Sequence, residues 1–306
     1  MMEDNAGHPV TLRELELSLG KLTRLHRLLY THGPGGGTLL LLPLDQGLEH
    51  GPRDFFVNPQ SADPAYQVRL ALVGGFSGIV LHYGLAHKYL RDVAGKVPLV
   101  LKLNGKTEIP PDQAAFSPLI STVSDAVRLG ADAVGYTLYV GSPAQDRDID
   151  QFRQVRDEAE FYGMPVIVWA YPRGAAIDAH GGRDSVYAID YAARVASELG
   201  ADIIKLSFPK TSGIDLDKLP APYNDMEFTP AGAIRQIIQS AGRSFVILSG
   251  GSRADDEDVM EKARLAMAAG ARGMIFGRNM WQRTWENSLN LSARLHELLR
   301  GYLLPE

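Results

Sequence analysis

The feature that most constrains the fold is a series of short apolar runs, each about as long as a β-strand. The runs are nearly continuous in apolar residues instead of alternating with polar ones, which is typical of strands buried on both faces of a parallel sheet. Eight such runs occur, at residues 38–45, 78–82, 98–103, 133–139, 165–171, 203–208, 245–251 and 273–278. We therefore expect eight parallel strands.

Amphipathic segments separate these runs and carry the signals of connecting helices. Three of them end directly before a glycine, the usual stop signal of a helix: 149–162, 184–199 and 255–269. A phrase that closes a helix and opens the next strand recurs at Gly130, Gly200 and Gly270, so successive copies are 70 residues apart. That spacing corresponds to two strand–helix units. The sequence predicts an α/β protein with a (β/α)₈ TIM barrel.

The alternative is a doubly wound open sheet, but the glycine-rich stretch Gly33–Gly37 precedes a strand instead of following one. We divide the chain into an N-terminal helical extension, residues 1–37, and a TIM-barrel catalytic domain, residues 38–306. Within the extension, residues 10–31 form a helical segment that we expect to cover the bottom of the barrel or an interface.

Composition excludes several classes of protein. The 306 residues are 45% hydrophobic and 22% charged with a net charge of −5, which fits a large core and no disordered or fibrous chain. Without a basic run, nucleic acid is not the expected partner. The absence of cysteine rules out disulfides and thiolate metal sites. No apolar run is long enough to span a membrane and the N-terminus is polar, so we expect a cytoplasmic protein that binds metabolites.

The active site of such a barrel lies at the C-terminal ends of its strands, where Lys205 is the most informative residue. It stands within an apolar run, and a buried lysine must pair with an anion or lose its charge. Burial and a neighbouring cation lower a lysine pKa from about 10.4 to roughly 7 or 8, where the amine attacks carbonyls and forms Schiff bases. Alternatively, Lys205 is structural and pairs with a carboxylate such as Asp45. Lys102 stands in a similar run, and sequence environment alone does not rank the two.

Asp45 and Tyr171 supply the proton-handling groups that Schiff-base chemistry needs. Asp45 ends the first run, and Tyr171 shares a strand face with Trp169 because the two are two residues apart. The alternatives are that Asp45 only starts a turn before Gly47 and that Tyr171 only fills the mouth of the barrel.

Two glycine-containing loops predict a phosphate site. Ser249, Gly250 and Gly251 end the seventh run, and Gly277 and Arg278 end the eighth. Small residues expose backbone N–H groups and arginine can bind phosphate as a fork, in the loops where barrels frequently bind phosphate. The alternative is that the glycines merely turn the chain. The eight histidines show no close metal-ligand spacing, so we expect neither a metal nor a cofactor.

Seven motifs in order resemble those of the archaeal-type class I fructose-bisphosphate aldolases, a Schiff-base family. The likeness covers about residues 38–283 and rests on LPLDQGLEHGP (42–52), LVLKLNGKT (99–107), AVGYTLYVGS (133–142), VIVWAYPRG (166–174), ADIIKLSF (201–208), LSGGS (248–252) and GRNMWQR (277–283). One departure is Gln46, where many members have Asp-His-Gly; it puts the preferred substrate in doubt, not the mechanism.

The resemblance implies reversible cleavage of fructose 1,6-bisphosphate. Position by position, Lys205 matches the Schiff-base lysine, Tyr171 the proton donor and Asp45 the catalytic aspartate. The phosphate loops match at these residues: Ser249, Gly250, Gly251, Gly277 and Arg278. We add Trp169, Lys102 and His50 as substrate-binding candidates, with Lys106, Arg173 and His50 considered for the second phosphate. The family also implies a homo-oligomer.

Two other functions remain open at this stage. One is a transaldolase-like synthase or a thiolase that acts on another phosphorylated ketose. The other is a phosphosugar-binding or scaffold protein that uses an inactive barrel.

Overall fold

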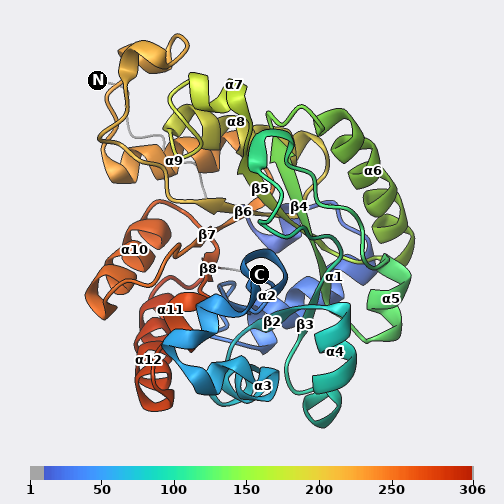
Figure 1. Ribbon diagram of the computed structural model, residues 1–306. Helices are drawn as coiled ribbons and strands as arrows, with labels where there is room; N and C mark the ends of the chain where they lie inside the picture. Colours follow the sequence, from blue (N-terminus) through green and yellow to red (C-terminus); the bar gives the residue numbers. More distant parts are fainter. Residues whose placement is uncertain (1–9, 305–306) are drawn as a thin grey trace.

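The structure, a computed structural model, describes residues 10–304 and consists of a closed barrel with helices around it (Figure 1). All eight strands pair in parallel and in chain order, and β1 also pairs with β8. The strands are β1 (Leu39–Pro43), β2 (Gly78–His82), β3 (Leu99–Lys102), β4 (Ala133–Val140), β5 (Val166–Pro172), β6 (Ile203–Ser207), β7 (Phe245–Ser249) and β8 (Gly273–Ile275). The predicted TIM barrel is confirmed, and the open doubly wound sheet is excluded.

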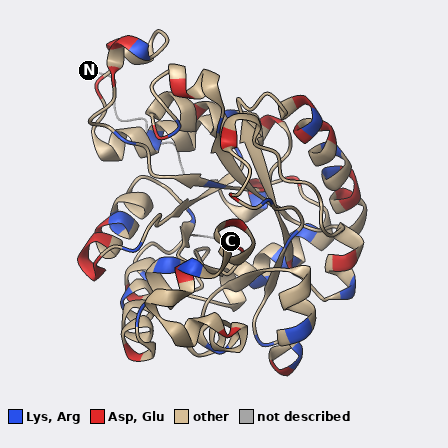
Figure 2. Ribbon diagram, in the orientation of Figure 1, with Lys and Arg blue, Asp and Glu red and all other residues tan. Residues whose placement is uncertain are grey.

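The larger helices surround the strands, as Figure 1 shows for α3, α4, α6, α9, α10 and α12. The α-helices are α1 (Leu19–His26), α2 (Gln46–His50), α3 (Pro64–Val73), α4 (Tyr83–Tyr89), α5 (Val123–Arg128), α6 (Gln145–Tyr162), α7 (Ala175–Ala179), α8 (Val186–Glu198), α9 (Pro230–Ser240), α10 (Asp256–Ala268), α11 (Arg278–Trp281) and α12 (Trp285–Arg300). Figure 2 shows basic and acidic residues interspersed over these outer helices, as on α6. None of the helices within residues 10–304 is long and apolar enough to cross a bilayer.

Several element boundaries differ from the sequence pattern, and two of them have an identifiable physical cause. Helix α6 begins at Gln145, before the apolar periodicity starts. Its first turn is held by Asp148, which is buried although the other residues of the turn are exposed: its carboxylate accepts hydrogen bonds from Tyr136 Oη at 2.6 Å and from the Tyr139 N–H at 2.9 Å. Strand β8 ends at Ile275, because Gly277 turns the chain into α11.

The core has two parts, one inside the barrel and one between the strands and the outer helices. Alternate strand residues such as Leu39, Val100 and Ile203 fill the interior, and the residues between them face the helices, as the two-residue repeat of a strand requires. Leu25 and Leu28 of the N-terminal segment belong to the interior cluster. This segment therefore closes the end of the barrel where the strands begin.

A buried lysine fastens the N-terminal segment to the barrel. Lys21 of α1 is 1% exposed and pairs with Asp202, directly before β6, at 3.0 Å, and with Glu160 of α6. Asp202 also accepts a hydrogen bond from the Val166 N–H at 2.8 Å, at the start of β5. The segment thus contacts the strands beneath the predicted site. The domain division at residues 37 and 38 stays a prediction, and residues 1–9 and 305–306 lie outside the described part.

Candidate active site

The predicted polar residues extend the inward face of the strands beyond the apolar interior. Lys102 stands two residues after Val100, and Lys205 stands two residues after Ile203, both of which are interior residues. Trp169 of β5 is itself in the interior cluster, and it is paired in register with Lys205 of β6. The two-residue repeat therefore gathers these side chains at the C-terminal end of the barrel.

Lys205 is 5% exposed, yet none of the described carboxylates forms an ion pair with it. Its amine donates a hydrogen bond to Tyr171 Oη and lies 4.3 Å from the centroid of that ring. Burial lowers the pKa of Lys205 to about 7; Lys102 and Arg173 act in the same direction, while Asp45 and Glu49 oppose them. Near neutral pH, a large fraction of this amine is therefore uncharged and nucleophilic.

The pKa of Tyr171 is shifted in the opposite direction. This pKa lies well above the ordinary value, first because burial disfavours the charged form and then because the charges of Glu49 and Asp45 disfavour phenolate. The hydroxyl therefore keeps its proton over the physiological range. A protonated phenol in contact with the reactive amine is suited to transferring a proton to or from a bound carbonyl compound.

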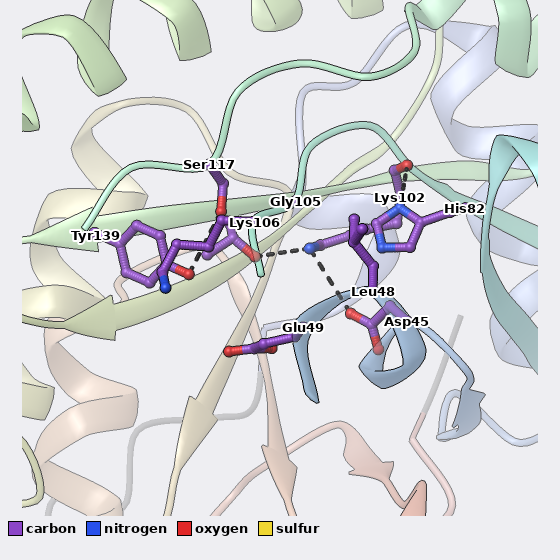
Figure 3. A pocket seen from close by; sticks show the side chains of 10 residues that line it. Asp45, Leu48, Glu49, His82, Lys102, Gly105, Lys106, Ser117 and Tyr139 are labelled. Atoms are coloured by element: carbon purple, nitrogen blue, oxygen red, sulfur yellow. Dashed lines mark hydrogen bonds and ion pairs between the residues drawn. The ribbon is translucent and has the colours of Figure 1, made fainter. Parts of the chain in front are cut away.

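Lys102 is the lysine that pairs with Asp45 (Figure 3). Its amine lies 3.7 Å from the Asp45 carboxylate and donates to Thr137 Oγ1 at 2.7 Å and to the Asn104 carbonyl at 3.3 Å. It also stands 5.1 Å from the centroid of the Trp169 ring. Sequence analysis considered the alternative that Lys205 is a structural lysine paired with Asp45. In the structure, Lys102 is the lysine in that position.

Asp45 precedes the short helix α2 but does not cap it with its side chain. Its carboxylate faces Lys102 and the pocket instead (Figure 3). Four residues later, Glu49 lines the same pocket. The i, i+4 spacing on a helix was the signal available for Glu49, although sequence analysis did not single it out.

Several residues that line the pocket in Figure 3 were not identified by sequence analysis. Thr137 and Tyr139 continue the inward face of β4, and Ser117 comes from the loop after β3 and donates to Tyr139 Oη at 3.4 Å. His82 ends β2, and its pKa is lowered to about 4, first by burial and then by Lys102. Lys205 and Tyr171 do not line this pocket themselves, but the Tyr171 ring stacks on Tyr139 at 6.4 Å between centroids.

The two predicted phosphate loops are joined side by side. Asn279 of α11 accepts from the Ala254 N–H at 2.8 Å and donates to the Ser252 carbonyl at 3.2 Å. A Cβ at Gly250 would lie 2.4 Å from the Phe276 ring, and one at Gly277 would lie 2.6 Å from Gln46 Nε2. Glycine is required at Gly250 because the loop after β8 approaches it so closely, whereas Gly277 lies against Pro43 and Gln46 at the end of β1. Ser249 is the last residue of β7, and Gly251, two residues later, has a φ of 69°.

Arg278 and His50 meet at one carboxylate. Asp54 lies 2.7 Å from His50 Nδ1 and 3.8 Å from the Arg278 guanidinium. Gln46 is also at this edge, and its side-chain oxygen is buried without a hydrogen-bond partner among the described residues. The structure therefore gathers His50, Arg278 and Gln46 around the loop after β8.

Lys106 and Arg173 meet at a different carboxylate. Asp112 lies 2.8 Å from the Lys106 amine and 3.3 Å from Arg173 Nε. The Arg173 guanidinium also lies 5.1 Å from the centroid of the Tyr171 ring. The three residues considered for a second phosphate are thus divided, with His50 beside Arg278 and the other two at Asp112.

No group of three or more histidine, aspartate or glutamate side chains within residues 10–304 is placed to hold a metal ion. The expectation that neither metal nor cofactor is needed stays a prediction.

Comparison with known proteins identifies the family. The model of the DeoC/LacD family aldolases matches residues 39–283. The chain is 38% identical over 269 residues to a class 1 fructose-bisphosphate aldolase of Thermoproteus tenax, covering 87% of this chain and 90% of that protein. It is 36% identical over 250 residues to the class 1 enzyme of Halobacterium salinarum, covering 81% of this chain and 85% of the relative.

Comparison with a solved structure supports the same family assignment. The structure is that of an archaeal fructose-1,6-bisphosphate aldolase whose catalytic lysine is covalently bound to the carbinolamine intermediate of its substrate. Identity is 34%, the TM-score is 0.77, and the match covers 91% of this chain and 99% of the other. The chain therefore belongs to the DeoC/LacD family of aldolases, and its resemblance to the archaeal-type class I fructose-bisphosphate aldolases is confirmed.

Proposed function

We propose that the protein is a Schiff-base aldolase that reversibly cleaves fructose 1,6-bisphosphate to dihydroxyacetone phosphate and glyceraldehyde 3-phosphate. The observation that carries this proposal is the buried Lys205 amine, which has no carboxylate partner within residues 10–304 and contacts Tyr171. The names of the relatives in Thermoproteus tenax and Halobacterium salinarum support the substrate.

Lys205 is the proposed nucleophile. Its neutral amine adds to the C2 ketone, and the resulting carbinolamine loses water to form an iminium ion. The bond between C3 and C4 then breaks, and its electron pair moves to the iminium nitrogen, which leaves an enamine. The C4 hydroxyl loses its proton and becomes the aldehyde of glyceraldehyde 3-phosphate.

Tyr171 and Asp45 are the proposed proton-handling groups. Tyr171 exchanges the proton, because its phenol is protonated and contacts the nitrogen that reacts. Asp45 orients the reacting hydroxyl from the pocket that it shares with Lys102. Protonation of the enamine at C3 and addition of water then release dihydroxyacetone phosphate and regenerate the lysine. Lys102 and Trp169 hold Asp45 and the substrate in place.

The two cationic ends of the site match a bisphosphate. We assign the phosphate nearest the ketone to Ser249, Gly250, Gly251, Gly277 and Arg278, with His50 beside Arg278. The second phosphate is assigned to Lys106 and Arg173, which share Asp112. A substrate with a single phosphate would leave one of these ends unused.

Borohydride reduction tests the mechanism. Incubation with dihydroxyacetone phosphate, reduction and peptide mass mapping are expected to give one adduct, on Lys205. An adduct on Lys102 alone would contradict the assignment of the nucleophile, and no adduct on either lysine would remove the Schiff-base mechanism. Cleavage of fructose 1,6-bisphosphate, measured by the release of both triose phosphates, tests the substrate.

We also propose a cytoplasmic homo-oligomer. The side chains of Leu19 at the start of α1 and Phe161 near the end of α6 are both 82% exposed. Gly20 and Gly163, the next residue in α1 and the residue directly after α6, pack against each other. Exposed apolar side chains on adjoining elements are typical of subunit contacts. Light scattering at several protein concentrations gives the subunit number, and a monomer throughout would contradict the proposal.

A further inference from the structure

The loop between β3 and α5 brings an acidic side chain into a cluster of cations. Asp112 begins a single 3₁₀ turn, Asp112–Ala114, and follows Pro110 and Pro111. Residues 108–114 are exposed, and the Asp112 side chain retains 46% of its accessible surface. The carboxylate is therefore on a segment that is not packed into the core, although the cations that it contacts are nearly buried.

Two cations contact this single carboxylate. Lys106 and Arg173 form ion pairs with it, and their side chains are 12% and 17% exposed. Burial raises the pKa of Asp112, but Lys106, Arg173 and Arg183 together outweigh burial and leave that pKa below its ordinary value. Arg183 comes from the connection between α7 and α8, to which sequence analysis assigned no role. Two nearly buried positive charges thus contact one negative charge, and the exposed Arg183 acts on it without forming an ion pair.

The cluster is incomplete as an ion-pair group. Counting Lys106 and Arg173 against Asp112 leaves one positive charge without a partner inside the cluster. The Arg173 Nε atom is buried and, despite its ion pair with Asp112, has no hydrogen-bond partner among the described residues. A phosphate monoester carries about 1.5 to 2 negative charges near neutral pH and offers three acceptor oxygens. Such a group matches the cluster better than one carboxylate does.

We propose that the Asp112 carboxylate occupies, in the free protein, the place that the second phosphate of the substrate takes in the complex with Lys106 and Arg173. The incoming phosphate displaces Asp112, and the exposed loop moves outward with it. Asp112 is then a specificity-determining residue, because only a substrate with a second phosphate displaces it. This inference rests on the proposed function.

The kinetic test compares two substrates, fructose 1,6-bisphosphate and fructose 1-phosphate, which lacks the second phosphate. Asp112→Asn removes the competing charge while it keeps the shape, so KM for the bisphosphate is expected to fall about threefold to tenfold. For fructose 1-phosphate, the change is expected to be much smaller. Glu198→Gln, which removes an exposed carboxylate paired with Arg194 on α8, is the matched control.

Two results would overturn the inference. A higher KM for the bisphosphate in Asp112→Asn would mean that the carboxylate orients the cations instead of competing with phosphate. Equal changes with both ketoses, or none with either, would mean that the second phosphate does not reach this cluster. If the unmodified protein cleaves neither ketose, the proposed function fails together with this inference, before any variant is compared.

Discussion

The two ends of the barrel each bury a lysine, and the difference lies in what each amine contacts. At the end closed by the N-terminal segment, Lys21 is 1% exposed and pairs with Asp202 and Glu160. At the open end, Lys205 is 5% exposed, and among the described residues its amine has only the Tyr171 hydroxyl as a hydrogen-bond partner and no carboxylate. Burial is therefore common to a fastening lysine and to a reactive one. The absence of a carboxylate partner is what marks Lys205.

The largest expected effect is on activity. Lys205→Met removes the proposed nucleophile, so we expect aldol cleavage to fall by at least about 10⁴-fold, measured as triose phosphate release. Lys96→Met, a change at an exposed lysine, is the control and is expected to keep the full rate. A normal rate in the Lys205→Met protein would show that Lys205 is not the reactive lysine.

Stability is expected to change in opposite directions at the two ends. Lys21→Met leaves Asp202 buried without its cation, so the free energy of unfolding should fall by about 3–5 kcal/mol. Lys205→Met removes an amine whose pKa is about 7 in the folded state and 10.5 when unperturbed, so unfolding should cost more, by on the order of a few kcal/mol.

The pH dependence sharpens this comparison. The folded protein binds fewer protons at Lys205 than the unfolded chain does between pH 7 and 10.5. The stability gain of Lys205→Met should therefore be complete below pH 7 and fade as the pH rises toward 10.5. Denaturant titrations of both proteins at pH 6.5 and 9.5 measure this gain in the free energy of unfolding. The same gain at both pH values would contradict the low pKa of Lys205.

Tyr171→Phe keeps the ring beside Lys205 but removes the hydroxyl. We expect kcat to fall by about 100-fold, since a positioned proton donor contributes at least that much, while KM changes little. If kcat falls by less than about threefold, another group transfers the proton.

The smallest effect is the pH dependence of adduct formation. With a pKa of about 7, the neutral fraction of Lys205 rises about tenfold between pH 6 and pH 8. The initial rate of borohydride trapping should rise by the same factor and then level off. A rate that keeps rising to pH 10 would mean that Lys205 is charged at neutral pH and that its environment resembles that of a paired lysine.

Much of the barrel could be predicted from sequence because its signals are local. Each strand is one apolar run, and the inward positions of Trp169, Tyr171 and Lys205 follow from the two-residue repeat. The boundaries that were missed depend on contacts between distant residues, as in the burial of Asp148 against β4.

The pairing of charges could not be predicted in the same way. The sequence environment of Lys102 and Lys205 did not rank the two, and only the family resemblance chose Lys205, because the partner of Asp45 depends on how β1 and β3 are placed around the barrel. Asp54 and Asp112 were missed for a similar reason. Each lies in a connecting segment, and its role depends on the cations that the fold places beside it. Apolar periodicity carries no information about such partners.

The contacts of Asp202 have a consequence for shortened forms of the protein. This one carboxylate joins the first residues of β5 and β6, the strands that carry Tyr171 and Lys205, and α1 neutralises it through Lys21. Trimming the chain up to about residue 30 would uncover an unpaired acid directly beneath the two reacting groups. A leading stretch that looks dispensable for chemistry would then govern the alignment of amine and phenol at the far end of the strands.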